Sequence, residues 1–266
     1  MEGRNQATIL FGILLASHSA LAQQASPPTL DEILIQLESN LLHYDTQIPN
    51  FFCSEHVVSL MLYGQKRQST VTDSIFRLEH TLNPDQTTKL AESREIKTIN
   101  GSPAEGKHIN GPTILAGVFS GGLDAVSLSQ KACMRYTLLP TKPGEPYVVQ
   151  FATLPNNRHR SGCVLKEDGA GRVFIDPAIM QVTRMELTVP HHIIIPTEPG
   201  VWGISVGYSP VLLGGQTFWM PTTITSTATP NDAYYPTVWS FDAHYTNCHK
   251  LGVTSRILPF GTPVVP

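Results

Sequence analysis

The chain has 266 residues, with 18 Lys and Arg against 21 Asp and Glu, a formal net charge of −3 and only 15% charged residues. It carries neither a basic stripe nor a run of like charges, which excludes nucleic acid as an expected partner and disfavours anionic lipid surfaces. The length suits one domain with a sizeable core.

The N-terminus has the pattern of a secretory signal peptide. Arg4 precedes an apolar run over residues 7–15, and Ala20-Leu21-Ala22 forms a small-x-small cleavage site. The run is too short to cross a bilayer as a helix. We therefore expect a signal peptide over 1–22, a single domain over 23–266, a periplasmic or secreted location and no transmembrane segment after signal removal. An anchor that is never cleaved is the alternative.

The first element of the mature chain is predicted to be a helix. Thr29 and Glu32 form a capping box, in which the hydroxyl and the carboxylate satisfy the first free amides. Apolar residues then follow at helical spacing, namely Leu30, Ile33, Leu34, Leu37, Leu41 and Leu42. The helix is expected to cover 29–44 and to stop before Pro49.

Most of the remaining chain alternates between apolar and polar residues, which is typical of half-buried strands. Ten strands are predicted, over 52–63, 70–82, 90–99, 134–139, 147–154, 171–176, 181–189, 202–208, 216–226 and 238–246. Asn100-Gly101 follows the third strand as a turn. A short central helix is predicted over 123–130, after a stretch that several glycines interrupt.

These elements indicate a mainly β protein of the α+β class. A sheet this long should curl, and the apolar stripe of the helix must be buried. We expect a strongly curved antiparallel sheet, with the N-terminal helix and the short central helix on its concave side.

Four cysteines are widely spaced along the chain and form no C-x-x-C pair. In an oxidising compartment an even count predicts two disulfides, for which three pairings are possible. Strand order favours Cys133 with Cys163, since they flank the strands over 134–154, and this leaves Cys53 with Cys248. Four buried free thiols are the alternative.

The C-terminal third resembles a known family. The motifs are Gly171-x-Val173-x-Ile175-Asp176-Pro177, Val182-x-Arg184-Met185-Glu186-Leu187, Tyr208-Ser209-Pro210, Phe218-Trp219-Met220-Pro221 and Tyr245-x-Asn247-x-His249-Lys250. They resemble the lipoprotein-carrier superfamily of outer-membrane lipoprotein-sorting-like proteins, and most narrowly uncharacterised secreted bacterial members. The resemblance implies an unclosed barrel whose apolar concave side receives acyl chains.

Three classes of function follow. The first is an exported, non-catalytic cell-envelope protein that binds a lipid, acyl chain or lipoprotein in the concave face of its sheet. Its expected ligand-binding residues are Phe76, Phe151, Met185, Leu187, Phe218 and Met220. The second is a protein-interaction or envelope-sensing module, in which the same residues are a filled core. The third is a hydrolase with a dispersed site.

Catalytic and metal-binding motifs do not support the third class. The segment 117–121 misses the spacing of a nucleophile elbow by one residue. His191 and His192 are adjacent, so in an extended chain they point to opposite sides and are poorly placed to share a metal. The sequence therefore predicts no enzyme, no cofactor and no metal site.

Overall fold

The computed structural model describes residues 27–105, 117–195, 198–231 and 237–252. The predicted signal peptide over 1–22 lies outside the described residues, as does part of the glycine-interrupted stretch before the central helix.

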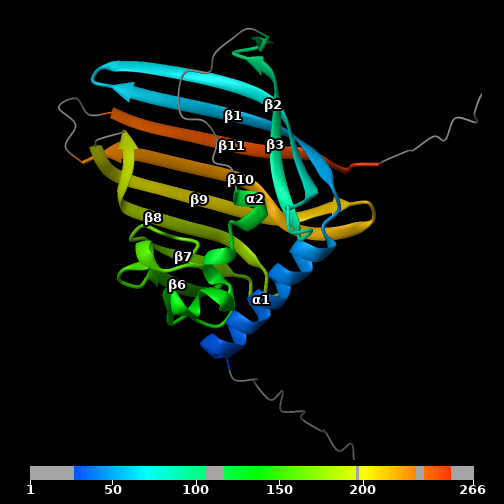
Figure 1. Ribbon diagram of the computed structural model, residues 1–266, viewed down its shortest axis with the longest axis vertical. Coiled ribbons are helices and arrows are strands. Elements are labelled where there is room, and N and C mark those ends of the chain that lie inside the picture. The colour runs from blue at the N-terminus through cyan, green and yellow to red at the C-terminus, as the bar shows by residue number, and fades with distance from the viewer. Residues whose placement is uncertain (1–26, 106–116, 196–197, 232–236, 253–266) are drawn as a thin grey trace, which may run out of the picture.

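The described residues form one eleven-stranded antiparallel sheet with a long N-terminal helix and four short helical segments (Figure 1). The strands are β1 (Phe51–Tyr63), β2 (Lys66–Leu82), β3 (Thr88–Ile99), β4 (Ser102–Pro103), β5 (Met134–Leu138), β6 (Tyr147–Thr153), β7 (Ala170–Ile175), β8 (Val182–Ile195), β9 (Glu198–Leu213), β10 (Gln216–Pro230) and β11 (Thr237–Lys250). The α-helices are α1 (Leu30–Gln47) and α2 (Val118–Gly121), and the 3-10 helices are η1 (Asp124–Val126), η2 (Leu128–Ala132) and η3 (Asn157–His159).

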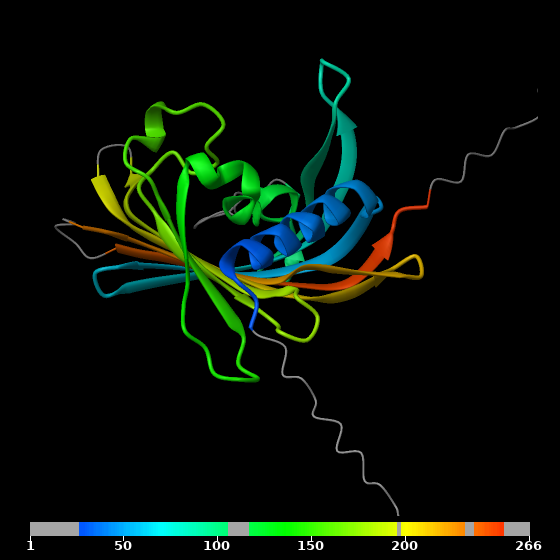
Figure 2. The same ribbon diagram turned by 90° about the horizontal axis from the view of Figure 1, so that it is seen from below.

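The order of the strands is β4-β3-β2-β1-β11-β10-β9-β8-β7-β6-β5. The sheet therefore has two ends, at β4 and β5, and is not closed into a barrel. Strands that are consecutive in the sequence are antiparallel neighbours, except β4 and β5, which lie at opposite ends of the sheet. β1 also pairs with β11, which joins the first strand to the last. Figure 2 shows the sheet as a curved layer with α1 and the central helices on its concave side. The predicted fold class is confirmed.

One row of cross-strand neighbours shows how the alternating pattern builds the core. Pairing registers place the following residues side by side from β5 to β3: Leu138, Val149, Val173, Met185, Val206, Ile224, Ala243, Val57, Thr72 and Ile99. All except Leu138, which is partly buried, are buried. Because successive residues of a strand point to opposite faces, this row fixes which face of the sheet the helices cover.

Helix α1 begins at the predicted capping box. Thr29 Oγ1 accepts a hydrogen bond from the Glu32 amide at 3.3 Å, and Glu32 Oε2 accepts one from the Thr29 amide at 2.7 Å. The helix buries Ile33, Leu34 and Leu37 against the sheet, whereas Leu42 is 56% exposed. It extends to Gln47, three residues beyond the predicted end.

The central region contains three short helices where one was predicted. Helix α2 precedes the predicted range, and η1 and η2 divide it at Ser127, whose backbone is extended. The Ser127 side chain accepts a hydrogen bond from the Ser129 amide and so caps η2. Serine competes with helical hydrogen bonding in this way, which explains why the helix is interrupted there.

Both predicted disulfides are present. Cys53 of β1 is bonded to Cys248 of β11 at a bulge in the pairing of these strands, where Asn247 has a φ of 51°. Cys133, after η2, is bonded to Cys163 in the loop before β7. Among the four cysteines, all within the described residues, no free thiol remains.

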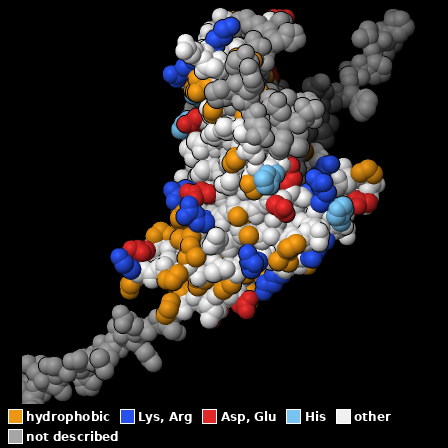
Figure 3. Space-filling model, turned by 90° about the vertical axis from the view of Figure 1, so that its left-hand side faces the viewer, with side chains coloured by type: hydrophobic (Ala, Val, Ile, Leu, Met, Phe, Trp, Pro, Cys, Tyr) orange, Lys and Arg blue, Asp and Glu red, His pale blue; other side chains and the backbone are white. Residues whose placement is uncertain are grey.

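No helix of the described residues has the length and apolar character needed to span a membrane. On the side of the molecule drawn in Figure 3, basic and acidic side chains are interspersed, and hydrophobic side chains gather toward the lower part. Ion pairs such as Arg172 with Glu186 at 2.7 Å follow this mixed pattern.

Candidate functional site: two cavities on the concave side

The six residues predicted to bind a ligand are all buried, with exposed fractions of 8% or less. The structure separates them into two groups. Phe151, Met185 and Leu187 line one cleft, whereas the other three, Phe76, Phe218 and Met220, lie elsewhere in the core. Phe76 packs against the Phe119 ring, with 4.3 Å between centroids, and Phe218 stacks on His43 of α1.

The first cavity, which we call the concave cleft, lies between the sheet and the central segment and has a volume of about 270 Å³. Its lining consists of apolar side chains and glycines: Gly117, Val118, Gly121, Gly122, Ala125, Phe151, Val164, Leu165, Met185, Leu187, Trp202 and Ile204. The one polar atom among these side chains, Trp202 Nε1, donates a hydrogen bond to Ser226 Oγ at 2.8 Å. The cleft is therefore suited to an apolar group.

The floor of the concave cleft depends on a glycine. Gly171 of β7 lies opposite Phe151 of β6, and a Cβ atom at Gly171 would come within 2.3 Å of the Phe151 ring. The ring can therefore lie over the neighbouring strand only because position 171 has no side chain. This contact helps to hold Phe151 at the base of the cleft.

One wall of the concave cleft is α2, which a buried carboxylate holds in place. Glu92 Oε1 accepts hydrogen bonds from the Phe119 amide at 2.8 Å, the Ser120 amide at 3.0 Å and Ser120 Oγ at 3.2 Å. These bonds satisfy amides that the start of a helix leaves free. Glu92 thereby joins β3 to α2.

Glu92 belongs to a buried charge cluster. Arg94 Nε donates to Glu55 Oε1 at 2.8 Å, and Arg94 Nη1 lies 3.7 Å from Glu92 Oε2. The Arg94 guanidinium also lies 4.9 Å from the centre of the Phe76 ring. Since one arginine faces two buried carboxylates, its loss would leave both uncompensated.

The opposite wall of the concave cleft is the loop that carries Val164 and Leu165. The Cys133–Cys163 disulfide ties this loop to η2, and the Gln130 side chain donates to the Gly162 carbonyl and accepts from the Val164 amide, both at 3.0 Å. Hydrogen bonds on one side, and a disulfide with hydrogen bonds on the other, therefore hold both walls of the concave cleft in place.

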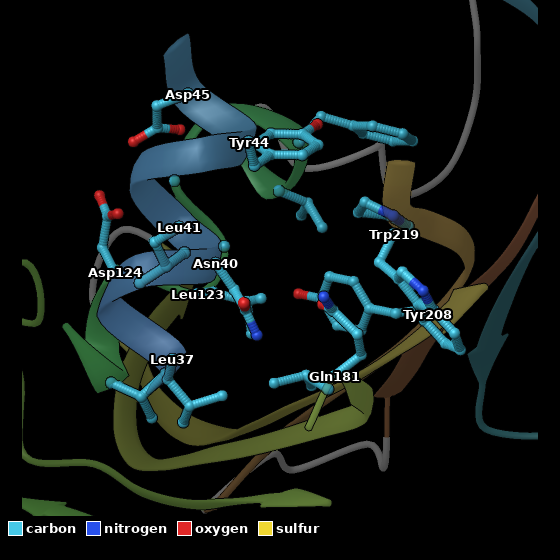
Figure 4. Close-up of a pocket in the computed structure, with 17 residues that line it drawn as sticks. Leu37, Asn40, Leu41, Tyr44, Asp45, Leu123, Asp124, Gln181, Tyr208 and Trp219 are labelled. Carbon is cyan, nitrogen blue, oxygen red and sulfur yellow. The ribbon is translucent and has the colours of Figure 1, made fainter. Parts of the chain in front are cut away.

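The second cavity, which we call the tyrosine pocket, lies between α1, the central segment and β9 and β10 (Figure 4). Its volume is about 50 Å³. It is lined by Leu37, Asn40, Leu41, Tyr44, Asp45, Val118, Phe119, Gly121, Gly122, Leu123, Asp124, Val126, Gln181, Val182, Tyr208, Trp219 and Pro221. Val118, Gly121 and Gly122 also line the concave cleft, so α2 separates the two cavities.

Two hydroxyl groups in the tyrosine pocket are buried without a partner among the described residues: Tyr44 Oη and Tyr208 Oη. Tyr208 is 6% exposed, and Figure 4 shows its ring extending from the sheet toward α1. Burial raises the pKa of both phenols, with a further contribution to Tyr44 from Tyr208 and to Tyr208 from Asp124. Buried hydroxyls normally have a hydrogen-bond partner, so an unpartnered pair in a cavity indicates a polar occupant.

Asp124 gives the tyrosine pocket an acidic end. Burial, and then the carboxylates of Asp45 and Glu38, raise its pKa to about 6. The pKa of Asp45 is raised by burial and by Glu38, while His80 lowers it. In Figure 4 the side chains of Asp45 and Asp124 lie on one side of α1, and Tyr208 and Trp219 on the other.

The sequence does not predict the tyrosine pocket. Tyr44 follows Leu37 and Leu41 at helical spacing, so the sequence places a hydroxyl-bearing aromatic residue on the buried face of the helix. This is the one sequence signal that points to the pocket. Tyr208 ends the strand predicted over 202–208 and begins the Tyr208-Ser209-Pro210 motif, and neither feature indicates a pocket. Nothing in the sequence shows that the two side chains meet, because they are far apart along the chain.

A third, more polar cleft of about 580 Å³ includes Asp45, His80 and Ser120 among its lining residues. These are the residue types of a hydrolytic triad, but the Ser120 hydroxyl and the His80 ring contact other groups. Ser120 Oγ donates to Glu92, His80 Nδ1 contacts Asn50 Oδ1 at 2.9 Å, and His80 Nε2 faces the Asp45 carbonyl at 3.5 Å. Among the described residues, no histidine therefore forms the hydrogen bond to Ser120 that a hydrolytic triad requires.

Histidines elsewhere form separate carboxylate pairs. His56 Nδ1 lies 2.7 Å from Asp73, and His192 Nδ1 lies 2.7 Å from Glu167. His191 and His192 follow the strand predicted over 181–189 but lie within β8, next to a bulge. Over the part of the chain that the structure describes, no group of three or more His, Cys, Asp or Glu is arranged to hold a metal.

Solved structures provide the comparison with known proteins. A DUF1329 family protein from Desulfovibrio piger aligns over 86% of this chain and 96% of its own, with a TM-score of 0.40 and 8% identity. A LolA superfamily protein from Nitrosomonas europaea aligns over the same fractions, with a TM-score of 0.35 and 9% identity. A putative outer membrane lipoprotein-sorting protein domain from Vibrio parahaemolyticus aligns over 82% and 92%, with a TM-score of 0.38 and 10% identity.

Two of these three neighbours carry names of the superfamily that the sequence resembles. Identities of 8 to 10% and TM-scores of 0.40 or less assign no function to this chain. No protein-family model and no curated relative matches the chain. None of these comparisons indicates a catalytic family.

Proposed function

We propose that the protein is an exported, non-catalytic protein of the cell envelope that holds an acyl chain, or a similar apolar part of a lipid or lipoprotein, in the concave cleft. The observation that carries the proposal is a cleft of about 270 Å³ lined by apolar side chains and glycines. This volume is close to the lower end of the range of about 300 to 1,000 Å³ found for small-molecule sites. Phe151, Met185 and Leu187 are the ligand-binding residues of the proposal.

Export is supported by two independent features. The signal-peptide pattern predicts cleavage before Gln23. The two disulfides are typical of a protein that folds in an oxidising compartment. N-terminal sequencing of protein collected from the cell envelope should begin at Gln23, and retention of Met1 would contradict the proposal of a cleaved signal.

The second candidate is a protein-interaction or envelope-sensing module whose concave side is a filled core, and a specific observation favours it. Phe76, Phe218 and Met220 were expected to line the binding cavity but are packed in the core, away from the concave cleft. If the cleft takes no ligand, the concave side would serve only as a core that supports a binding surface elsewhere.

Two matched substitutions distinguish the candidates. Met185→Trp places a larger side chain in the concave cleft, so it should weaken binding of a fluorescent fatty acid by at least about tenfold and leave stability nearly unchanged. Met220→Trp is the control, because Met220 is fully buried away from the cleft. It should overpack the core and destabilise the fold by about 1 to 3 kcal/mol.

The measurements are probe titration and urea unfolding of the wild type and both variants. Native mass spectrometry of the exported protein would reveal a lipid that purifies with it. A wild-type protein that binds no probe, together with equal destabilisation by both substitutions, would reject the carrier function in favour of the interaction module.

A further inference from the structure

The charged side chains that line the tyrosine pocket all have the same sign. Its two charged lining residues, Asp45 and Asp124, are both acidic, and Glu38 is close enough to contribute to the raised pKa of Asp124. Among the described residues, no Lys or Arg forms a salt bridge with these three carboxylates. Burial and Glu38 raise the pKa of Asp45, although the His80 side chain lowers it. The pocket therefore favours a positive or neutral group over an anion.

The other end of the tyrosine pocket is aromatic. Tyr44, Phe119, Tyr208 and Trp219 contribute rings to its lining. The faces of such rings carry partial negative charge and attract organic cations. Aromatic side chains also provide an apolar surface for the carbon atoms next to a charged head.

Tyr208 supplies the second, independent indication of an occupant. Its side chain is more than nine-tenths buried, its hydroxyl is unpartnered among the described residues, and its ring extends across the pocket toward α1 (Figure 4). Asn40 and Gln181 add amide groups to the same lining. A ligand with a hydrogen-bonding group would satisfy this hydroxyl.

From these features we infer that the tyrosine pocket binds an ammonium group carried on a short apolar body, with the charge toward Asp45 and Asp124 and the carbon atoms against the aromatic rings. The volume of about 50 Å³ restricts the enclosed part to a few heavy atoms. The ammonium can belong to a free amine or to a lipid headgroup. The inference concerns a different cavity from the concave cleft and does not depend on the proposed function.

The test compares three probes of the same length that differ in charge: butylammonium, butanol and butyrate. Their binding is followed by NMR through groups of the pocket itself, the indole N–H of Trp219 and the side-chain amides of Asn40 and Gln181. At pH 7.5, butylammonium should bind most tightly and butyrate least. Equal or tighter binding of butyrate, or no response to any probe, would overturn the inference and leave the pocket as a site for water.

Asp124→Asn and Asp45→Asn keep the size of each side chain and remove its charge. Each should weaken butylammonium binding by about fivefold, as expected for a partly exposed charge pair, and leave butanol binding unchanged. Asp31→Asn removes an exposed carboxylate of α1 outside the pocket lining, so it is the matched control and should have no effect on either probe. If the double Asn variant retains the preference for butylammonium over butanol while its backbone spectrum remains native, the acidic end does not select the ligand and the inference fails.

Vesicles distinguish the two sources of ammonium. Sedimentation with phosphatidylethanolamine vesicles, but not with phosphatidylglycerol vesicles, would identify a lipid headgroup, provided that Asp124→Asn weakens this sedimentation. Butylammonium binding without vesicle binding would identify a soluble amine. Binding to phosphatidylglycerol in preference to phosphatidylethanolamine would contradict the inferred charge selectivity.

Discussion

Arg94 Nε lies 2.8 Å from Oε1 of Glu55, in a contact where the Glu55 side chain is fully buried and that of Arg94 is 17% exposed. The two residues lie on β3 and β1, which are separated in the sheet by β2. This contact therefore spans three strands beneath α2.

Replacing Arg94 with Met should destabilise the protein strongly, because Glu55 and Glu92 would remain buried without a cation. The expected loss is about 3 to 5 kcal/mol in the free energy of unfolding, measured by urea titration. Arg77→Met is the matched control, since Arg77 pairs with Glu95 at the surface and should contribute less than about 1 kcal/mol. Equal effects of the two substitutions would show that the cluster does not stabilise the fold.

Glu92→Ala should loosen α2 without unfolding the sheet. The substitution removes the acceptor of three hydrogen bonds from Phe119 and Ser120, at an expected cost of about 1 to 3 kcal/mol. Hydrogen exchange of those two amides should accelerate more than exchange in β9 or β10. Glu92→Gln retains an acceptor oxygen and should give a smaller change, and unaltered exchange in the Ala variant would contradict the role assigned to Glu92.

Removing the disulfides one at a time should lower the free energy of unfolding by unequal amounts. The sequence separations are 195 residues for Cys53–Cys248 and 30 for Cys133–Cys163. On the loop-entropy model these bridges contribute about 5 and about 4 kcal/mol respectively. Double serine variants compared by urea unfolding test this order, and non-reducing peptide mapping should recover both links. A larger loss from the shorter loop would mean that its local packing outweighs chain entropy.

Asp124 should make stability depend on pH in a defined direction. Its pKa is raised from the ordinary 3.8 to about 6 in the folded protein, so the folded state binds the proton more readily than the unfolded state. The free energy of unfolding therefore decreases as pH rises from about 4 to about 6 and is constant above that for this group. Asp124→Asn should be more stable than the wild type at pH 7, and the difference should vanish near pH 4. Denaturant midpoints measured at each pH check this, and a difference that grows as pH falls would have the wrong sign.

The sheet could be predicted from the sequence because each strand carries its own signal. Alternation such as that of Trp202, Ile204 and Val206 depends only on neighbouring positions, and so does the capping box at Thr29. Cysteine positions relative to the strands were also sufficient to favour the correct pairing. Each of these signals depends either on residues that are close together in the sequence or on the order of the strands.

The candidate site could be predicted only in part because burial does not distinguish a cavity wall from a filled core. Leu187 and Met220 have the same pattern in the sequence, yet only Leu187 lines the concave cleft. The difference arises where Val118 and Gly121 of α2 pack over the sheet, which no strand pattern encodes. The position of α2 depends in turn on Glu92, a charged residue whose burial is exceptional for its type.

The pairing of β1 with β11 constrains how the chain can fold. β1 lies between β2 and β11, so one side of it stays open until residues 237–250 have been synthesised. Until then the meander of β1, β2 and β3 presents an unpaired strand edge, which is a site for association between chains. Contacts between such distant residues also slow folding. The protein therefore completes its sheet only after nearly all of the chain has emerged, and we expect its folding in the cell to benefit from a chaperone that shields the open edge of β1.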